Sequence, residues 1–191
     1  MLDLKVHNKI PPEKGKVLIT EPFVNDDYFG RSIILLCEHN EEGSFGFVLN
    51  KYIDIEIEEL SDFDPSLTRL SKGGPVGNKH LYFLHTFGDK LSGSIHISDG
   101  IYTGGDFEEL IGMAKLGLIK PNQVRFFLGY SGWTTNQLEG ELKQNSWLVA
   151  DIMSTESIMD TSNSSIWQDY MNHQGGKYKA FSHFPENPHL N

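Results

Sequence analysis

The chain has 191 residues, of which 38% are hydrophobic and 12% aromatic, so it can fold as one domain with a sizeable core, and an intrinsically disordered protein is excluded. Twenty-six acidic residues and sixteen basic ones give a formal net charge of −10, and no run of bases supplies the positive patch that nucleic-acid binding needs. The longest unbroken apolar run, residues 33–37, is far shorter than the roughly 20 residues that span a bilayer, and the single cysteine without a secretory signal indicates a soluble protein of the reducing cytoplasm.

The first half of the chain predicts mostly β-structure. A polar leader over residues 1–15 precedes a strand over 15–20. Residues 31–39 are rich in branched apolar side chains, and a four-residue connection leads from them to the alternating residues 44–50, which together predict a β-hairpin. Residues 53–60 alternate strictly but carry three glutamates, so they predict only a weak element. The glycine and proline cluster at 73–77 predicts a tight turn.

The second half mixes strands and helices. Strands are predicted over 80–86, 93–98, 123–130 and 145–151, and a helix over 165–174 is closed by two glycines. Asp106 and Glu109 are spaced as a capping box for a helix that ends at Gly117.

Thr134 and Gln137 have the same spacing, so a helix over 135–144 should begin directly after Trp133. If Thr134 is its cap, Thr134→Ala should cost about 1 kcal/mol of stability. The melting temperature checks this prediction.

Clusters of sequential strands with helices between them predict an α+β fold with a largely antiparallel or mixed sheet. No internal repeat or linker divides residues 1–191, so a single domain is expected. The tail over 177–191 carries two prolines and three aromatic residues and is predicted to be extended.

Ser131 is a candidate nucleophile, because residues 129–133 (GYSGW) resemble the Gly-x-Ser-x-Gly turn of hydrolases. Trp133 occupies the position of the second glycine, which that sharp turn needs, and the histidines that follow lie near or in the tail. We therefore interpret Ser131 as a turn residue whose hydroxyl bonds locally. No catalytic residue is assigned.

Cys37 and His39 suggest a thiol and imidazole pair on one face of a strand. Their attachment points would lie about 6.5 Å apart, whereas direct proton transfer needs heavy atoms within about 3.2 Å, and a cysteine that ends an apolar strand is more often an inert core residue. The sequence contains no His-Glu-x-x-His, Cys-x-x-Cys, calcium-loop or Walker motif, so neither a metal nor a cofactor is expected.

Several motifs taken in order resemble the AlgH/YqgE family of bacterial proteins. They are LITEPF (18–23), RSIILLCEHNEEGSFGFVLNK (31–51), GGPV (73–76) with FLH (83–85) after it, and GYSGWTTNQLEGEL (129–142) with NSWL (145–148) behind it. The resemblance runs from residue 16 to about residue 150.

This resemblance implies a compact single-domain α+β fold with a curled, barrel-like, mainly antiparallel sheet and packed helices, in a cytosolic setting. The family is linked by name to regulation of alginate production in one lineage, and it implies no reaction. The family typically has alanine at the position of Ser131, which argues further against a nucleophile there.

We therefore expect a non-catalytic regulatory protein that binds a small ligand or a protein partner near the 73–75 and 130–137 turns. Glycine-rich turns bring backbone donors close to a ligand, and flat aromatic rings offer contact area. Two alternatives stay open: a hydrolase or thiol-dependent enzyme that uses Cys37 and His39, and a nucleic-acid binder. It also stays open whether Trp133 fills the core instead and Gln137 is used in capping. The candidate ligand-binding residues are Gly73, Gly74, Pro75, Tyr130, Gly132, Trp133, Gln137, Glu139, His39 and Asn40.

Overall fold

A computed structural model describes residues 8, 10–24, 26, 28–64, 66 and 69–184 of the chain. Within them nine strands form one sheet in the order β6-β7-β5-β8-β3-β2-β1-β9, with β4 paired to β8 beside this path. The strands are β1 (Lys16–Thr20), β2 (Ile33–Asn40), β3 (Gly43–Val48), β4 (Ser71–Lys72), β5 (Val76–His85), β6 (Ser94–Ser98), β7 (Ile101–Gly104), β8 (Val124–Thr134) and β9 (Trp147–Asp151).

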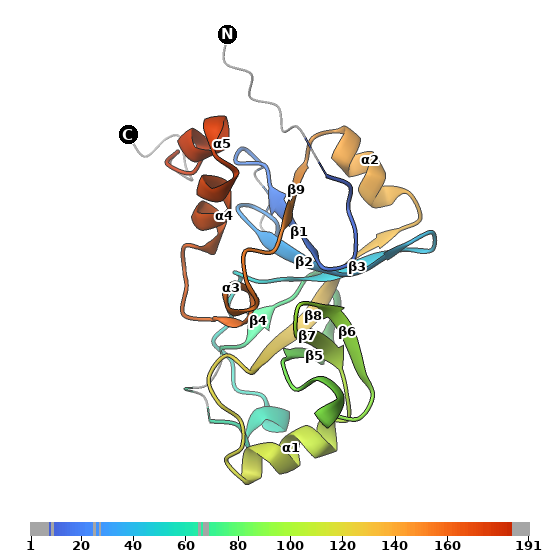
Figure 1. Cartoon of the computed structure of the whole chain (residues 1–191), viewed down its shortest axis with the longest axis vertical. Coiled ribbons are helices and arrows are strands. Elements are labelled where there is room, and N and C mark those ends of the chain that lie inside the picture. Colours follow the sequence, from blue (N-terminus) through green and yellow to red (C-terminus); the bar gives the residue numbers. More distant parts are fainter. Residues whose placement is uncertain are drawn as a thin grey trace.

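Five α-helices pack around this curled sheet in the described part of the chain (Figure 1). They are α1 (Phe107–Lys115), α2 (Gln137–Lys143), α3 (Thr155–Met159), α4 (Ile166–Gln174) and α5 (Gly176–Phe181), with short 3-10 turns η1 (Glu58–Leu60) and η2 (Gly88–Lys90). Figure 1 shows α2, α4 and α5 around β1, β2 and β9, whereas α1 lies at the opposite end of the molecule. Among the strand pairs of the described residues, only β4 with β8 is parallel. The predicted α+β fold with a curled, mainly antiparallel sheet is confirmed.

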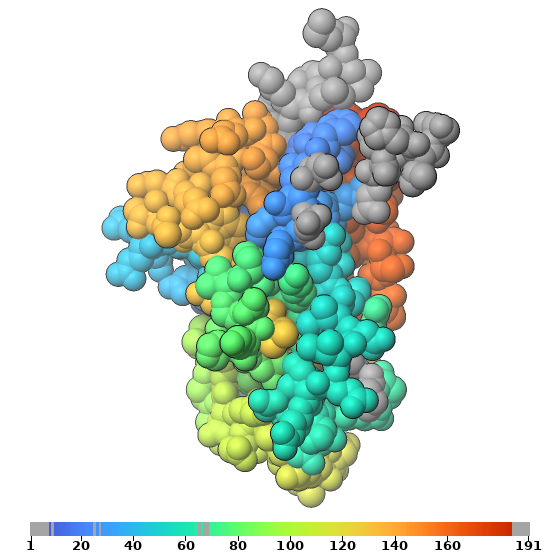
Figure 2. All heavy atoms as spheres, turned by 180° about the vertical axis from the view of Figure 1, so that it is seen from behind, coloured from blue at the N-terminus to red at the C-terminus, as the bar shows by residue number. Residues whose placement is uncertain are grey.

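Strand β8 joins the two halves of the sheet. Its residues 124–130 pair with β5, and its residues 131–134 pair with β3. Tyr130 is opposite Val76 of β5, while Gly132 is opposite Phe45 of β3. Strand β8 therefore changes its pairing partner between Tyr130 and Ser131. The β2–β3 hairpin projects from the body of the molecule beyond this point (Figure 2), and the candidate site lies beside it.

Three apolar clusters fill the spaces between sheet and helices. One lies between β1–β3 and the helices α4 and α5, a second lies under α2, and a third lies beside α1. Arg125 of β8 is fully buried among them, and its guanidinium donates to the backbone carbonyls of Leu49 and Ile158. Burial lowers the pKa of Arg125. Because buried carbonyls need partners, this arginine ties β8 to two distant segments.

The segment after residue 130 differs from its prediction. The chain continues as strand to Thr134, because β3 supplies a backbone partner, and α2 begins only at Gln137. Asn136, with a left-handed φ of 60°, is the residue at the N-terminal boundary of α2. Thr134 is therefore not the cap of this helix, and residues 130–134 are not a turn.

Other boundaries also move. The hairpin connection is two residues long, 41–42, and β5 begins at Val76 inside the predicted glycine and proline turn. Strand β7 and the helices α3 and α5 were not predicted. Helix α5 corrects the expected extended tail, since Tyr178 and Phe181 face the core. Residues 1–7 and 9 of the predicted leader and 185–191 of the tail lie outside the described residues.

Candidate functional site

A cleft of about 610 Å³ lies where the β2–β3 hairpin, the end of β8 and the start of β5 meet. Seen from behind, the hairpin (light blue) projects beneath α2 (orange) and away from the body of the molecule (Figure 2). The residues that line the cleft come from segments about 40 to 90 positions apart in the chain. The cleft therefore exists only because the sheet curls at β8.

Three half-buried aromatic residues line the cleft beside Val76 and the buried Trp133: Phe45 of β3, Tyr82 of β5 and Tyr130 of β8. The Tyr130 ring lies 6.0 Å from the Phe45 ring at 83° and 5.6 Å from the Tyr82 ring at 76°. Edge-to-face packing is a favoured arrangement for aromatic side chains. It sets the Tyr130 ring nearly perpendicular to both neighbouring rings.

Two glycines lie beside the Tyr130 ring. A methyl group at Gly132 would lie 3.0 Å from Cε2 of Tyr130, and one at Gly77 would lie 3.4 Å from Cε1 of the same ring. Gly77 also has a φ of +58°, which side-chain-bearing residues rarely adopt. Gly132 therefore leaves room for one edge of the ring, and Gly77 supplies a backbone conformation that favours glycine.

The rim of the cleft is acidic and polar. The exposed residues Glu38, Asn40 and Glu42 line it from the hairpin. Asn40 is held by both neighbours: its Nδ2 donates to Glu38 Oε1 at 2.7 Å, and its Oδ1 accepts from the Glu42 backbone N–H at 2.8 Å. No lysine, arginine or histidine belongs to the described lining residues. The rim therefore presents negative charge beside an apolar floor.

The opposite face of the hairpin packs against α2. His39 and Ser44 are directly opposed on β2 and β3, so their side chains share that face. Ser44 Oγ lies 2.7 Å from His39 Nδ1, and Glu139 of α2 places Oε1 3.7 Å from His39 Nε2. This chain of polar contacts joins the hairpin to α2.

The indole of Trp133 is a core group. Only 6% of Trp133 is exposed, and its Nε1 donates to Glu141 Oε2 at 2.9 Å. The same carboxylate oxygen accepts a hydrogen bond from Trp147 Nε1 at 2.7 Å. Gln137 donates to Glu141 and accepts from the Thr134 backbone N–H. Trp133 and Gln137 are thus occupied by contacts within the protein.

The 73–75 turn lies beside the cleft without lining it. A methyl group at Gly73 would lie 2.2 Å from the Gly129 carbonyl oxygen, and one at Gly74 would meet the Tyr130 backbone at 2.2 Å. These glycines therefore allow two stretches of backbone to approach closely, and Pro75 leads into β5. Of the ten candidates, the structure brings Asn40, Tyr130, Gly132 and Trp133 to the cleft. His39 and Glu139 lie together behind the hairpin.

Ser131 is inside β8 and fully buried, and its hydroxyl donates to the Gly73 carbonyl at 3.1 Å. The expected local turn contact is wrong, because the strand carries the hydroxyl to a residue 58 positions away. This contact holds β8 to the segment after β4, and it leaves Ser131 without access to a substrate.

Cys37 is also buried, and burial raises the pKa of its thiol. A register shift between Leu36 and Glu38 inserts one extra residue into β2. Such a β-bulge changes the alternation of side chains. Cys37 packs in the core beneath α4 and α5, while His39 faces α2, so the expected shared face is wrong.

The sequence interpretation missed the other lining residues, above all Glu38, Phe45, Val76 and Tyr82. Recognising residues 129–134 as strand would have placed Gly132 opposite the hairpin, but the pairing of β5 with β8 has no local signature. In the described residues, no group of three or more His, Cys, Asp or Glu side chains is placed to hold a metal ion. No helix in that part of the chain has the length and apolarity to cross a bilayer.

Comparison with known proteins finds one family that matches most of the chain. The profile of a family described as AlgH-like matches residues 17–179. A UPF0301 protein of Cytophaga hutchinsonii is 45% identical over 183 residues, which cover 93% of this chain and 98% of that protein. A UPF0301 protein of Parabacteroides distasonis is 41% identical over 190 residues, with coverage of 97% and 94%.

Two solved structures share the fold. The crystal structure of a protein from Corynebacterium diphtheriae superposes with a TM-score of 0.76 at 24% identity, covering 93% of this chain and 95% of that one. The solution structure of the AlgH protein from Pseudomonas aeruginosa gives a TM-score of 0.70 at 24% identity, with coverage of 94% and 98%. At this identity the likeness concerns the fold alone.

Proposed function

The chain belongs to the AlgH-like family, and from that premise we propose that it is a non-catalytic regulatory protein of the cytoplasm that binds a ligand in the cleft beside the β2–β3 hairpin. The cytoplasmic setting is supported by the single cysteine, which is buried and cannot form an internal disulfide. The ligand would act by occupying the junction between the two halves of the sheet.

The observation that carries this proposal is the group of three half-buried aromatic residues that line an open cleft. A volume of about 610 Å³ falls inside the range of roughly 300 to 1,000 Å³ that is usual for small-molecule sites. The three rings pack on the main core with one side and remain partly exposed in the cleft. Partly exposed aromatic rings beside a few polar groups that can orient a ligand are typical of binding sites.

Native mass spectrometry of gently purified protein tests the proposal, with Tyr130→Ala as the cleft variant. Tyr28→Ala is a matched control, because Tyr28 is also half-buried but contacts Phe29 and Lys72 away from the cleft. We expect a bound species on the wild type and on Tyr28→Ala that is lost from Tyr130→Ala. A bare chain in all three proteins, or a bound mass that Tyr130→Ala retains, would contradict the proposal.

A hydrolase is the second candidate, and one contact favours it. Ser44 Oγ lies 2.7 Å from His39 Nδ1, a distance at which an imidazole can accept a hydroxyl proton, and Glu139 approaches the other ring nitrogen. Ser44 thereby replaces the buried Cys37 as the nucleophile of this alternative. An alkyl fluorophosphonate separates the two functions: a label on Ser44 that Ser44→Ala abolishes would assign catalysis, whereas a binding protein stays unlabelled.

A further inference from the structure

The cleft combines two features that select for the charge of a ligand. Its lining includes the half-buried rings of Phe45, Tyr82 and Tyr130, and the exposed carboxylates of Glu38 and Glu42. The faces of aromatic rings are negative and attract cations. The two carboxylates add formal negative charge next to those rings, so both features favour the same kind of ligand.

We propose that the ligand is a small organic cation with a quaternary or otherwise alkylated ammonium head, which lies against the three rings with Glu38 and Glu42 as its counter-charges. This inference rests on the proposed function, because it names the ligand class of the same cleft. An alkylated ammonium fits better than a metal ion, since alkyl groups pack on rings, whereas a metal would require several oxygen ligands.

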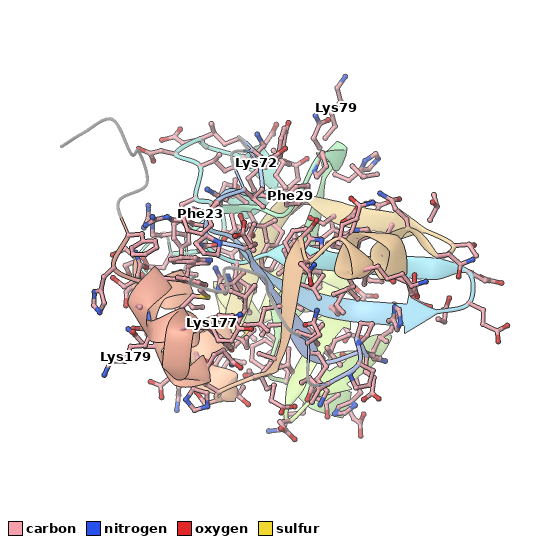
Figure 3. All side chains as sticks on the ribbon, turned by 90° about the horizontal axis from the view of Figure 1, so that it is seen from above. Phe23, Phe29, Lys72, Lys79, Lys177 and Lys179 are labelled. Carbon is pink, nitrogen blue, oxygen red and sulfur yellow. The ribbon has the colours of Figure 1, made fainter. Side chains whose placement is uncertain are left out.

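The surroundings of the cleft leave its negative charge in place. In the part of the chain that the structure describes, neither Glu38 nor Glu42 pairs with a basic side chain. Figure 3 shows Lys79 of β5 pointing away from the body of the molecule, and Lys177 and Lys179 on α5 at the end opposite the hairpin. Lys72 lies over the Tyr28 ring, 3.9 Å from its centroid. An anionic ligand would thus meet carboxylates, while no lysine, arginine or histidine is among the described residues that line the cleft.

The Tyr130 ring is the central wall of this arrangement. It is nearly perpendicular to both other rings and packs edge-to-face with them, while Gly132 leaves room for one of its edges. Because packing against Phe45 and Tyr82 already orders the Tyr130 ring, little further ordering of this side chain is needed on binding, which favours affinity. A cation at the centre of the cleft can therefore contact more than one ring.

Calorimetric titration with choline and with its neutral isostere 3,3-dimethyl-1-butanol tests the charge directly, because the two molecules differ in little but the positive nitrogen. Cation–π attraction at a partly desolvated site predicts that choline binds about tenfold or more tightly than the isostere. Equal affinities, or tighter binding of the isostere, would overturn the inference.

Variants of the full-length chain test which residues of the cleft bind choline. Tyr130→Leu should weaken choline binding about tenfold or more, whereas Tyr130→Phe keeps the ring and should stay within about threefold. Glu38→Gln and Glu42→Gln should each weaken it about two- to fivefold, and less at high salt because ions screen an exposed charge. Glu56→Gln is the matched control, since Glu56 lies in a different groove, and it should leave the affinity unchanged. Equal losses for Leu and Phe at Tyr130 would contradict the ring contact.

The outcomes separate this inference from the proposed function. If native mass spectrometry shows a species that depends on Tyr130 while choline binds no better than its isostere, the cleft binds a ligand but the cation is wrong. A peptide with trimethyl-lysine is the second arm of the titration. Binding of that peptide tighter than choline, lost in Tyr130→Leu, would overturn the small-molecule source and place the ammonium head on a protein side chain.

Discussion

His85 is a buried histidine whose environment requires the neutral ring. It is fully buried between the rings of Phe87 and Tyr102, each 5.7 Å away and nearly parallel to it. Nδ1 accepts from the Phe87 backbone N–H at 3.2 Å, and Nε2 lies 3.2 Å from Ser94 Oγ. Burial lowers the pKa of His85, with a smaller opposing effect from a backbone hydrogen bond.

His85 should make the protein less stable in mild acid. Its folded pKa lies below the ordinary value near 6.5, so the unfolded chain takes up a proton first as pH falls. The stabilisation that neutral His85 gives to the folded state is fully present above about pH 6.5. It is lost as pH falls from there to the folded pKa, and the free energy of unfolding changes by at most about 1.4 kcal/mol per pH unit. Urea unfolding between pH 5 and 7.5 measures it.

His85→Gln is the variant that checks this origin, because its amide can still accept and donate a hydrogen bond but does not titrate. As pH falls, the free energy of unfolding of the wild type should decrease relative to that of His85→Gln. A difference that stays constant over this pH range would contradict the assignment.

The two helix starts show how far a local pattern can be trusted. Asp106 caps α1 as predicted, since its carboxylate accepts from the backbone N–H groups of Glu108 and Glu109. Glu109 instead contacts Ser92, so the reciprocal half of the capping box is absent there. Thr134 has the same spacing to Gln137, but pairing with Gly43 keeps it in β8. Tertiary pairing overrides a local signal when it satisfies the same backbone groups.

Alanine substitutions at the two positions should therefore differ. Asp106→Ala should lower the free energy of unfolding by about 1 kcal/mol, because two backbone donors lose their acceptor. Thr134→Ala removes only an exposed 3.3 Å contact with Gln137 and should cost less than about 0.5 kcal/mol. Chemical denaturation of both variants measures the difference, and a loss of about 1 kcal/mol in Thr134→Ala would restore the original assignment of the cap.

The C-terminal helices close one side of the molecule. Phe181 of α5 is fully buried, and its ring lies 5.9 Å from Phe23 and 6.2 Å from Tyr178. It belongs to the same apolar cluster as Leu35 and Phe47 of the sheet. The predicted extended tail is thus partly a helix that completes the core.

Removal of the Phe181 ring should strongly destabilise the whole fold. Phe181→Ala should lower the free energy of unfolding by about 3 to 5 kcal/mol, since it leaves a cavity in the main core. That is a large part of the roughly 5 to 15 kcal/mol that stabilises a typical protein. Leu116→Ala is the control, because Leu116 is 74% exposed and its loss should change little. A small effect of Phe181→Ala would mean that α5 is not part of the cooperative unit.

Local patterns in the sequence were sufficient to predict the buried strands β1, β2 and β9, the β2–β3 hairpin, the cap of α1 and the fold class. Each of these depends on side chains within a few positions of one another, where apolar periodicity and capping chemistry act directly. The family resemblance could be recognised for the same reason, since its motifs are contiguous.

The cleft could not be predicted from the sequence, because only the tertiary structure brings its residues together. The rings of Phe45, Tyr82 and Tyr130 meet because β8 pairs with β5 up to Tyr130 and with β3 from Ser131 onward. The bulge at Cys37, which turns His39 away from the thiol, is likewise a property of the pairing between β2 and β3. Strand register and curl arise from contacts between distant segments, so they leave no local pattern in the chain.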